Sequence, residues 1–246
     1  MGCHPLSVVT AITVQDTLGV DAVYPIDSDW IVDQARAVLE DMPVSCFKMG
    51  LLGSVEAIAA IAEIVADYPD IPLVLDPVLA SGRGDDMTSE DIISAMCELI
   101  IPQTTLITPN SQEARRLTED EDAEENTLQT LDDCAKKLLE FGSEYVLITG
   151  THENTPDVIN ILYGESGRRL GSQSWKRLPG SYHGSGCTLA SAIAACLAHG
   201  LSMEDAVKEA QEFTWQALAH AYHPGMGQHI PDRLFWARET EDEKTN

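Results

Sequence analysis

Basic residues are scarce in this sequence. Its 246 residues include 15 lysines and arginines against 40 aspartates and glutamates, which gives a formal net charge of −25. A chain with this excess of negative charge is a poor partner for nucleic acid or for an anionic membrane surface. Any phosphate-bearing ligand must therefore be held locally, by backbone amides, a metal ion or a few cations. The densest acidic runs, 119–125 and 239–244, are expected to be a solvated loop and tail.

Paired cysteines, long apolar runs and internal repeats are also missing. None of the six cysteines belongs to a CxxC pair, which argues against a disulfide framework or a zinc site and favours a reducing cytoplasm. No apolar run reaches the length of a membrane span, and no signal-peptide pattern is present. No composition break marks a linker, so we predict a single domain over residues 1–238 and a charged tail over residues 239–246.

A glycine-rich turn is the most informative local feature. Gly184, Ser185 and Gly186 stand directly before Cys187, and the small, apolar segment 189–198 that follows is typical of a buried helix. Glycines let the backbone approach a ligand closely, and the first turn of a helix offers unpaired N–H groups to an anion. The same field favours the thiolate of Cys187. These features suit phosphoryl transfer, and the alternative is a plain strand-to-helix turn with a buried cysteine.

Strand-like runs alternate with helix-like segments along the chain. Alternation of this kind predicts an α/β fold with a mostly parallel central sheet and helices on both faces. The last two strands resemble a hairpin, which adds an antiparallel element, and the first strand is expected to be buried. The expected strands are 6–14, 23–26, 45–49, 73–75, 105–108, 145–149, 158–163 and 168–175, and the expected helices are 28–39, 54–66, 89–99, one from 111, 130–141, 189–198 and 202–222.

Charged and amide side chains stand at the ends of predicted elements. Lys48, near the end of one strand, could meet a phosphate, and Asp76, after the next, could lie beside a metal or a phosphate. The simpler alternatives are a surface lysine and a turn-forming aspartate. Asn110 and Glu113, three positions apart across a helix start, could hold a hydrated Mg²⁺. Their alternative is helix capping, by Ser111 with a glutamate near the helix dipole.

Two further residues could contact an organic ligand. Gln15 lies just past the carboxyl end of the first predicted strand, where α/β proteins usually place ligand contacts. Its amide both donates and accepts hydrogen bonds, so it could bind the edge of a heterocycle. His183 stands beside the glycine-rich turn. A loop glutamine and a satisfied loop histidine are the alternatives.

Taken together, the motifs resemble one enzyme family. The chain is similar to the hydroxymethylpyrimidine/phosphomethylpyrimidine kinases of thiamin biosynthesis, within the ribokinase superfamily. Cys187 is the most specific feature, because most relatives in that superfamily carry aspartate there. The motifs occur in family order over nearly the whole chain, as QDT at 15–17, KMGLL at 48–52, VLDPV at 74–78, ITPNSQEA at 107–114 and GSGCT at 184–188.

The resemblance implies an activity and a role for each residue. ATP with Mg²⁺ would phosphorylate 4-amino-5-hydroxymethyl-2-methylpyrimidine and then its monophosphate. Cys187 would activate the attacking oxygen, and the amides from Gly184 through Ser185 and Gly186 would form an anion hole. Asn110 and Glu113 would hold the metal through water, and Asp76 and Lys48 would lie beside the phosphates. Gln15 and Val78 would line the pyrimidine pocket. The nucleotide would lie near the loop after Thr149.

The sequence departs from the family at two places. The family begins with a strand and a D-P-[S/T]-G-G-A-G segment that have no counterpart here. We expect that Met1 is an internal methionine and that upstream codons encode this segment; the alternative is a short chain with a half-built pocket. The loop at Gly150, Thr151 and His152 also differs from the family's lysine-glycine-glycine-histidine pattern.

Other functions remain open at this stage. A pyridoxal or pyridoxine kinase is the nearest alternative, since the superfamily shares its scaffold and motif. A catalytically impaired, ligand-binding homologue is a second alternative, which the intact Cys187, Asn110 and Glu113 disfavour. The family resemblance also implies a possible homodimer.

Overall fold

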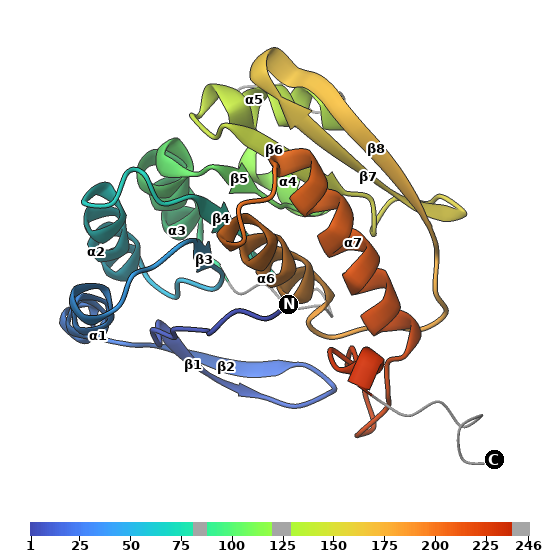
Figure 1. The fold of residues 1–246 in the computed structure, drawn as a ribbon, viewed down its shortest axis with the longest axis horizontal. Helices are drawn as coiled ribbons and strands as arrows, with labels where there is room; N and C mark the ends of the chain where they lie inside the picture. Colours follow the sequence, from blue (N-terminus) through green and yellow to red (C-terminus); the bar gives the residue numbers. More distant parts are fainter. Residues whose placement is uncertain (81–87, 120–128, 238–246) are drawn as a thin grey trace.

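A six-stranded sheet forms the centre of the molecule (Figure 1). The computed structural model describes residues 1–80, 88–119 and 129–237. The sheet has the order β3-β4-β5-β6-β7-β8, parallel from β3 to β6 and antiparallel from β6 to β8. Its strands are β3 (Phe47–Met49), β4 (Leu73–Leu75), β5 (Leu106–Ile107), β6 (Tyr145–Thr149), β7 (Asp157–Gly164) and β8 (Arg168–Lys176). The predicted mostly parallel sheet with a terminal hairpin is confirmed.

The parallel strands are covered on both faces. In β4, Leu73, Val74 and Leu75 are all fully buried. Side chains alternate along a strand, so Leu73 and Leu75 join one core layer and Val74 joins the other. A strand that is buried on both faces must be uniformly apolar, and the three residues of β4 meet this requirement.

Helices form a layer on each side of the sheet (Figure 1). One layer contains α1 (Ser28–Asp41), α2 (Val55–Ala66), α3 (Glu90–Ala95), α4 (Ser111–Leu117) and α5 (Leu131–Glu140), and the other contains α6 (Ser185–Ala198) and α7 (Met203–Ala219). Shorter helical turns are η1 (Met96–Ile100), η2 (Ile101–Gln103), η3 (Glu165–Gly167) and η4 (Phe235–Ala237). Over the described ranges, no helix combines the length and apolar character needed to span a membrane.

Capping residues set the helix starts. The side chains of Ser54, Thr130 and Ser202 each accept a hydrogen bond from a backbone N–H three positions later, as expected of N-caps. The end of α7 differs from the prediction, because the helix stops at Ala219. Tyr222 instead forms a β-bridge with the returning C-terminal segment.

The segment 6–14 is not a buried strand of the main sheet, contrary to prediction. The strand β1 (Ala11–Gln15) pairs antiparallel with β2 (Val20–Pro25) in a separate two-stranded sheet. Ile12 and Val14 are 55% and 49% exposed. The apolar pattern predicts an extended backbone, but which face becomes covered depends on contacts from distant parts of the chain.

Backbone hydrogen bonds join three distant segments near the start of α6. His183 N–H donates to the His229 carbonyl at 2.9 Å, and His229 N–H donates to the Ser181 carbonyl at 2.9 Å. Gln228 N–H donates to the carbonyl of Thr17, in the loop between β1 and β2, at 2.6 Å. The hairpin loop, the C-terminal segment and the glycine-rich turn therefore lie together.

Some expectations fall on residues that the structure does not describe. These are the acidic run from 120 to 125 and the charged tail at 239–246. The division into one domain and a tail also stays a prediction.

Candidate active site

Lys48 and Asp76 meet where β3 and β4 end. Lys48 Nζ lies 3.2 Å from Asp76 Oδ2. The two residues are neighbours because β3 and β4 pair in register, and Asp76 N–H extends this pairing by donating to the Met49 carbonyl at 2.9 Å. Asp76 is 5% exposed, and a carboxylate so buried needs a partner. Lys48 is therefore a half-buried partner of this carboxylate and not a surface lysine.

The first turn of α6 lies beside this ion pair. Gly184 is the N-cap and has a φ of +83°, a left-handed conformation that favours glycine. Ser185, Gly186 and Cys187 follow as the first helical residues, whose N–H groups have no acceptor within the helix. A methyl group on Gly186 would lie 3.6 Å from Asp76 Oδ1, so the turn and the carboxylate are in contact distance.

Cys187 lies at an exposed position in this turn, but its surroundings oppose the thiolate. Desolvation by the surrounding protein, with a smaller effect of the Asp76 charge, raises the pKa of the Cys187 thiol to about 11. Lys48 and Arg233 act in the opposite direction. Desolvation and a nearby carboxylate therefore act against the thiolate that the helix start was expected to favour, and the state of Cys187 during the reaction stays a prediction.

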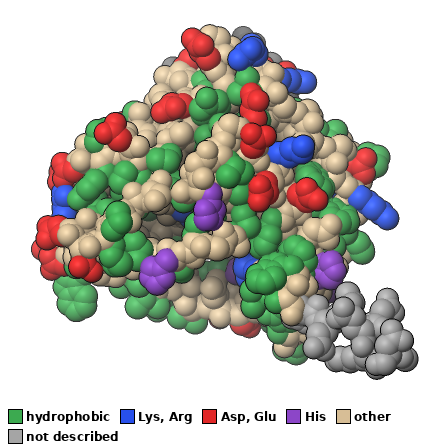
Figure 2. Space-filling view, viewed as in Figure 1, with side chains coloured by type: hydrophobic (Ala, Val, Ile, Leu, Met, Phe, Trp, Pro, Cys, Tyr) green, Lys and Arg blue, Asp and Glu red, His purple; other side chains and the backbone are tan. Residues whose placement is uncertain are grey.

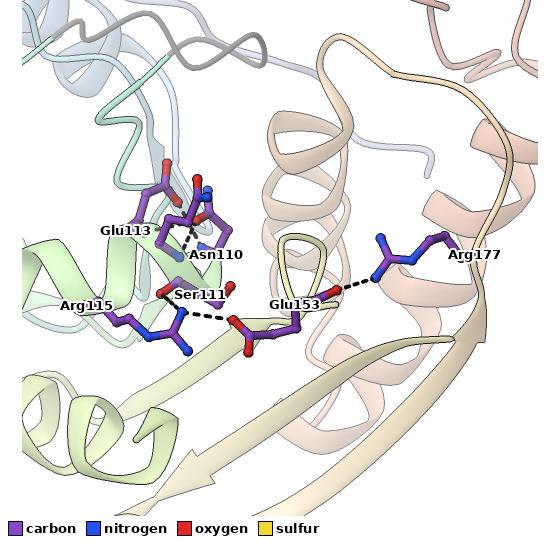
Figure 3. A network of polar contacts seen from close by, with 7 residues as sticks. Asn110, Ser111, Glu113, Arg115, Glu153 and Arg177 are labelled. Carbon is purple, nitrogen blue, oxygen red and sulfur yellow. Dashed lines mark hydrogen bonds and ion pairs between the residues drawn. The ribbon is translucent and has the colours of Figure 1, made fainter. Parts of the chain in front are cut away.

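Asn110 and Glu113 form a capping box at the start of α4 (Figure 3). Asn110 Oδ1 accepts from Gln112 N–H and Glu113 N–H, each at 2.9 Å, and Glu113 Oε2 accepts from Asn110 N–H at 2.9 Å. The cap is therefore Asn110 and not Ser111, which corrects the capping alternative. Both of these hydrogen bonds use the capping oxygen of Asn110, which is therefore committed to the cap.

Glu113 is half-buried beside a second carboxylate. Desolvation and, to a smaller extent, the charge of Asp76 raise the pKa of Glu113 to about 7, although backbone hydrogen bonds from Asn110 and Leu79 oppose the shift. The two carboxylates are thus close enough to repel each other. This local excess of negative charge is what a cation would relieve.

Gln15 and His183 line one cavity, of about 550 Å³. The wall combines the hairpin loop, the residue before the glycine-rich turn and the C-terminal segment: Gln15, Asp16, Thr17, Leu18, His183, Gly225, Met226 and Ile230. The walls fit closely, since a methyl group on Gly227 would come within 1.9 Å of the Thr17 carbonyl oxygen. The volume suits a small organic molecule.

Val78 lies two residues beyond Asp76. Its N–H donates to the Asp76 carbonyl at 2.9 Å, and its carbonyl accepts from the Thr88 hydroxyl at 3.4 Å. The side chain is half-buried. A contact between Val78 and a ligand stays a prediction, because the loop that follows it enters the undescribed range 81–87.

Thr149 ends β6 next to Asn110. The two residues form a parallel β-bridge, and Thr149 N–H donates to the Pro109 carbonyl at 2.9 Å. The next residue, Gly150, is held by the buried Asn160, whose Oδ1 accepts from Gly150 N–H at 3.1 Å. The loop after Thr149 therefore begins beside the capping box of α4.

Two arginines that the sequence did not single out fix this loop (Figure 3). Arg177 donates to the carbonyls of Thr151, Glu153 and Thr155 at 2.8, 3.0 and 3.1 Å. Arg115 Nη1 lies 2.9 Å from Glu153 Oε1. No local motif marks either arginine, because each acts on residues more than twenty positions away in the chain.

Arg233 is a third residue that the sequence did not reveal. Its Nε donates to Thr188 Oγ1 at 3.0 Å, and Thr188 in turn donates to the Gly184 carbonyl at 2.6 Å. The only sequence signal would have been a basic residue in an otherwise acidic chain. Figure 2 shows how few basic side chains the visible face carries beside its acidic ones.

The arrangement as a whole is suited to moving a phosphoryl group. Free backbone amides, two cations and a thiol surround the start of α6, with two carboxylates adjacent to them. Such preorganised donors and charges are the main requirement of phosphoryl transfer. The fold and the site thus define a ribokinase-like phosphotransferase.

Comparison with known proteins gives the family. The sequence model of the phosphomethylpyrimidine kinase family matches residues 1–232, and the chain belongs to this family. It is 36% identical over 239 residues to the hydroxymethylpyrimidine/phosphomethylpyrimidine kinase of Mycobacterium tuberculosis, covering 96% of this chain and 85% of that protein. It is 33% identical over 243 residues to a bifunctional thiamine biosynthesis protein of Geobacter sulfurreducens, covering 98% of this chain and 49% of that protein. The chain therefore spans about half of the bifunctional relative.

Solved structures agree with this assignment. The phosphomethylpyrimidine kinase of Clostridium difficile has a TM-score of 0.72 at 31% identity, over 88% of this chain and 87% of the other. The pyridoxal kinase of Bacillus subtilis, solved with ADP, has a TM-score of 0.79 at 27% identity, over 94% of this chain and 86% of the other. The predicted family and the predicted kinase class are both confirmed.

Proposed function

We propose that this protein uses ATP to phosphorylate 4-amino-5-hydroxymethyl-2-methylpyrimidine and then its monophosphate. The observation that carries the proposal is the contact between a small-molecule cavity and an anion-binding turn: His183 lines the cavity, and the turn that begins at Gly184 follows it directly. Family membership supplies the substrate class, since the relatives are named for these two kinase activities. Use of ATP follows from the kinase family.

The acceptor would bind in the cavity. Gln15 lies at its wall with an exposed amide that can donate to and accept from the edge of a pyrimidine. Val78, near the end of β4, would contact the ring from the Asp76 side. The hydroxymethyl group would then point toward Cys187.

The thiolate form of Cys187 would orient the attacking oxygen and take its proton as the new bond to phosphorus forms, which leaves Cys187 as the neutral thiol. Because burial raises the pKa of this group to about 11, only a small fraction is thiolate at neutral pH, and the alcohol is not deprotonated in advance. Phosphoryl transfer through a loose transition state does not require this, because the acceptor needs little charge before the bond forms. Lys48 lowers the pKa of Cys187 and so favours the thiolate that accepts the proton, and the amides of Gly184 through Cys187 would stabilise the moving phosphoryl group.

Mg²⁺ would be held through water. In the described part of the chain, no group of three or more His, Cys, Asp or Glu residues could chelate an ion directly. The residues fit an ion bound mainly by phosphate oxygens and water, since Glu113 and Asp76 repel each other and their carboxylate oxygens can accept hydrogen bonds from metal-bound water beside Asn110 at the start of α4. When bound, Mg²⁺ supplies neutralisation of the nucleotide phosphates.

The nucleotide would lie along the loop that follows Thr149. Arg177 and Arg115 hold this loop rigid, and it starts beside the proposed metal residues. Lys48 and Asp76 would lie on the phosphate side of the nucleotide. The departure of Gly150, Thr151 and His152 from the usual family pattern leaves backbone groups, held by Arg177, as the main contacts.

Pyridoxal phosphorylation is the second candidate. The specific observation in its favour is the structural similarity to pyridoxal kinases, with TM-scores up to 0.79. A competition assay separates the two: both compounds are supplied at equal concentration with ATP and Mg²⁺, and the products are counted by mass spectrometry. We expect the pyrimidine to be phosphorylated at least about tenfold faster, a margin that small pocket differences can supply. A preference for pyridoxal would overturn the proposal.

We further propose a homodimer that works in the cytoplasm. The β1–β2 hairpin presents Ile12 and Tyr24, which are paired across its two strands and are 55% and 60% exposed, together with Val14. An exposed apolar face of this kind favours association with another protein surface. The six free cysteines are compatible with a reducing compartment.

A further inference from the structure

Arg233 is a cation at the glycine-rich turn that forms no ion pair with a carboxylate of the described residues. Lys48, the other cation there, is paired with Asp76 at 3.2 Å. For Arg233, the described residues provide no carboxylate within ion-pair distance. In a chain with a net charge of −25, an arginine left without an acidic partner beside a phosphoryl-transfer site is unexpected unless a ligand pairs with it.

The guanidinium is held in a defined place. Its Nε donates to Oγ1 of Thr188, which is 3% exposed, so one end of the group rests on a buried residue. Its Nη2 lies against the turn, since a methyl group on Gly184 would be 3.0 Å from it. Arg233 itself is exposed, and its Nη donors make no hydrogen bond within residues 1–80, 88–119 and 129–237, which leaves them for a ligand.

The proposed second reaction creates a need for such a cation. The monophosphate differs from the alcohol by a group that carries nearly two negative charges at neutral pH. Asp76 and Glu113 both lie close to this site and would repel that group. Arg233 lies close enough to Cys187 to lower the pKa of the thiol. The positive charge of Arg233 therefore also acts at the place where the acceptor oxygen would lie.

We propose that Arg233 binds the phosphate group of the monophosphate acceptor and thereby gives the enzyme its second phosphorylation step. The proposal rests on the proposed function. Two N–H donors of a guanidinium can bind two phosphate oxygens at once, a geometry that lysine cannot reproduce. The alcohol acceptor has no group for Arg233 to bind, so its phosphorylation should depend little on this residue.

The test compares the two acceptors in Arg233→Gln. The values of kcat/KM are measured for the alcohol and for the monophosphate at saturating ATP and Mg²⁺. We expect a loss of at least about tenfold for the monophosphate, mainly through KM, and a change within about threefold for the alcohol. Arg233→Lys should restore part of the loss. Arg168→Gln, at an exposed arginine in β8, removes the same charge elsewhere and should change neither value.

Equal losses with both acceptors would overturn the proposal, because they would show that Arg233 only supports the turn through Thr188. Unchanged kinetics with the monophosphate would also overturn it. A failure of the proposed function is distinguishable from both, since the unmodified protein would then phosphorylate neither acceptor.

Discussion

Glu113 illustrates how one residue serves both stability and a proposed catalytic role. The pKa of Glu113 is about 7 in the folded chain, above the ordinary value of 4.5. A raised pKa means that the folded protein holds a proton that the unfolded chain has lost between these two values. The stability contributed by Glu113 is therefore present below pH 4.5 and is lost as the pH rises through 7.

Glu113→Gln should remove this pH dependence. Urea unfolding at pH 5 and pH 8 should show that the variant gains stability relative to the unmodified chain at the higher pH, by at most about 3 kcal/mol. Glu56→Gln, at an exposed glutamate in the first turn of α2, is the matched control. The same stability difference at both pH values would contradict the role assigned to Glu113.

Asp76 should restrain the reactivity of Cys187. Asp76→Asn removes one cause of the raised thiol pKa, so Cys187 should react faster with iodoacetamide at pH 8. A pKa lowered by one unit increases the thiolate fraction about tenfold, which sets the scale of the effect.

This reaction is best measured in a Cys3→Ser background, because Cys3 is also exposed. Asp67→Asn, which removes a carboxylate paired with Arg36, provides the control. An alkylation rate that stays the same or falls in Asp76→Asn would refute the electrostatic account.

Site residues that stand at the ends of predicted elements could be selected from the sequence, whereas site residues that act through distant parts of the chain could not. Lys48, Asp76, Asn110, Glu113 and the Gly184–Cys187 turn could be selected from the sequence because each stands at an element boundary. In the structure, Lys48 pairs with Asp76, and the start of α6 lies beside this pair. Arg115, Arg177 and Arg233 could not be selected, since their contacts depend on how distant segments pack.

At the scale of elements, the loop after β6 depends on Gly150. A methyl group at this position would lie 2.3 Å from the Ile159 carbonyl oxygen, so Gly150→Ala must displace the backbone. We expect a lower melting temperature and a KM for ATP raised about tenfold, because the displaced loop is the proposed nucleotide contact. Gly171→Ala in β8, where a methyl group meets nothing within 4 Å, is the control. Unchanged ATP kinetics in Gly150→Ala would argue against this loop as a nucleotide site.

Some of the strands and helices could be predicted from sequence patterns alone. Strands buried on both faces, such as β4 and β6, are uniformly apolar, and helix caps carry specific side chains, so both were predicted within a few residues. The first strand was misplaced because an apolar alternation does not reveal its partner. Ile12 and Val14 lie on an exposed face of a hairpin, which would be unusual unless another surface covers it.

At the scale of the whole molecule, the hairpin face should mediate dimerisation. The native mass should be about twice the 26.8 kDa of the chain when measured by light scattering. Val14→Asp should give a monomer, because a charge would be buried at the interface. Val55→Asp, at a less exposed valine that begins α2, should remain dimeric. A monomeric unmodified protein, or a dimer that persists in Val14→Asp, would contradict this interface.

The two core layers bring together residues that are far apart in sequence. β3 and β4 supply Lys48 and Asp76, α4 supplies the capping box, and α6 supplies the glycine-rich turn. The C-terminal segment lines the cavity and is hydrogen-bonded to the hairpin loop. The chemistry therefore depends on the complete fold and not on any single motif.

The most direct test of the account is ATP-dependent phosphorylation of the hydroxymethylpyrimidine, followed by mass spectrometry, with Cys187→Ala in parallel. We predict that the folded protein forms both the monophosphate and the diphosphate, and that Cys187→Ala is slower by about 10²- to 10⁴-fold, the usual contribution of a positioned proton acceptor. Absence of both products from the folded protein, or equal rates in the variant, would contradict the account.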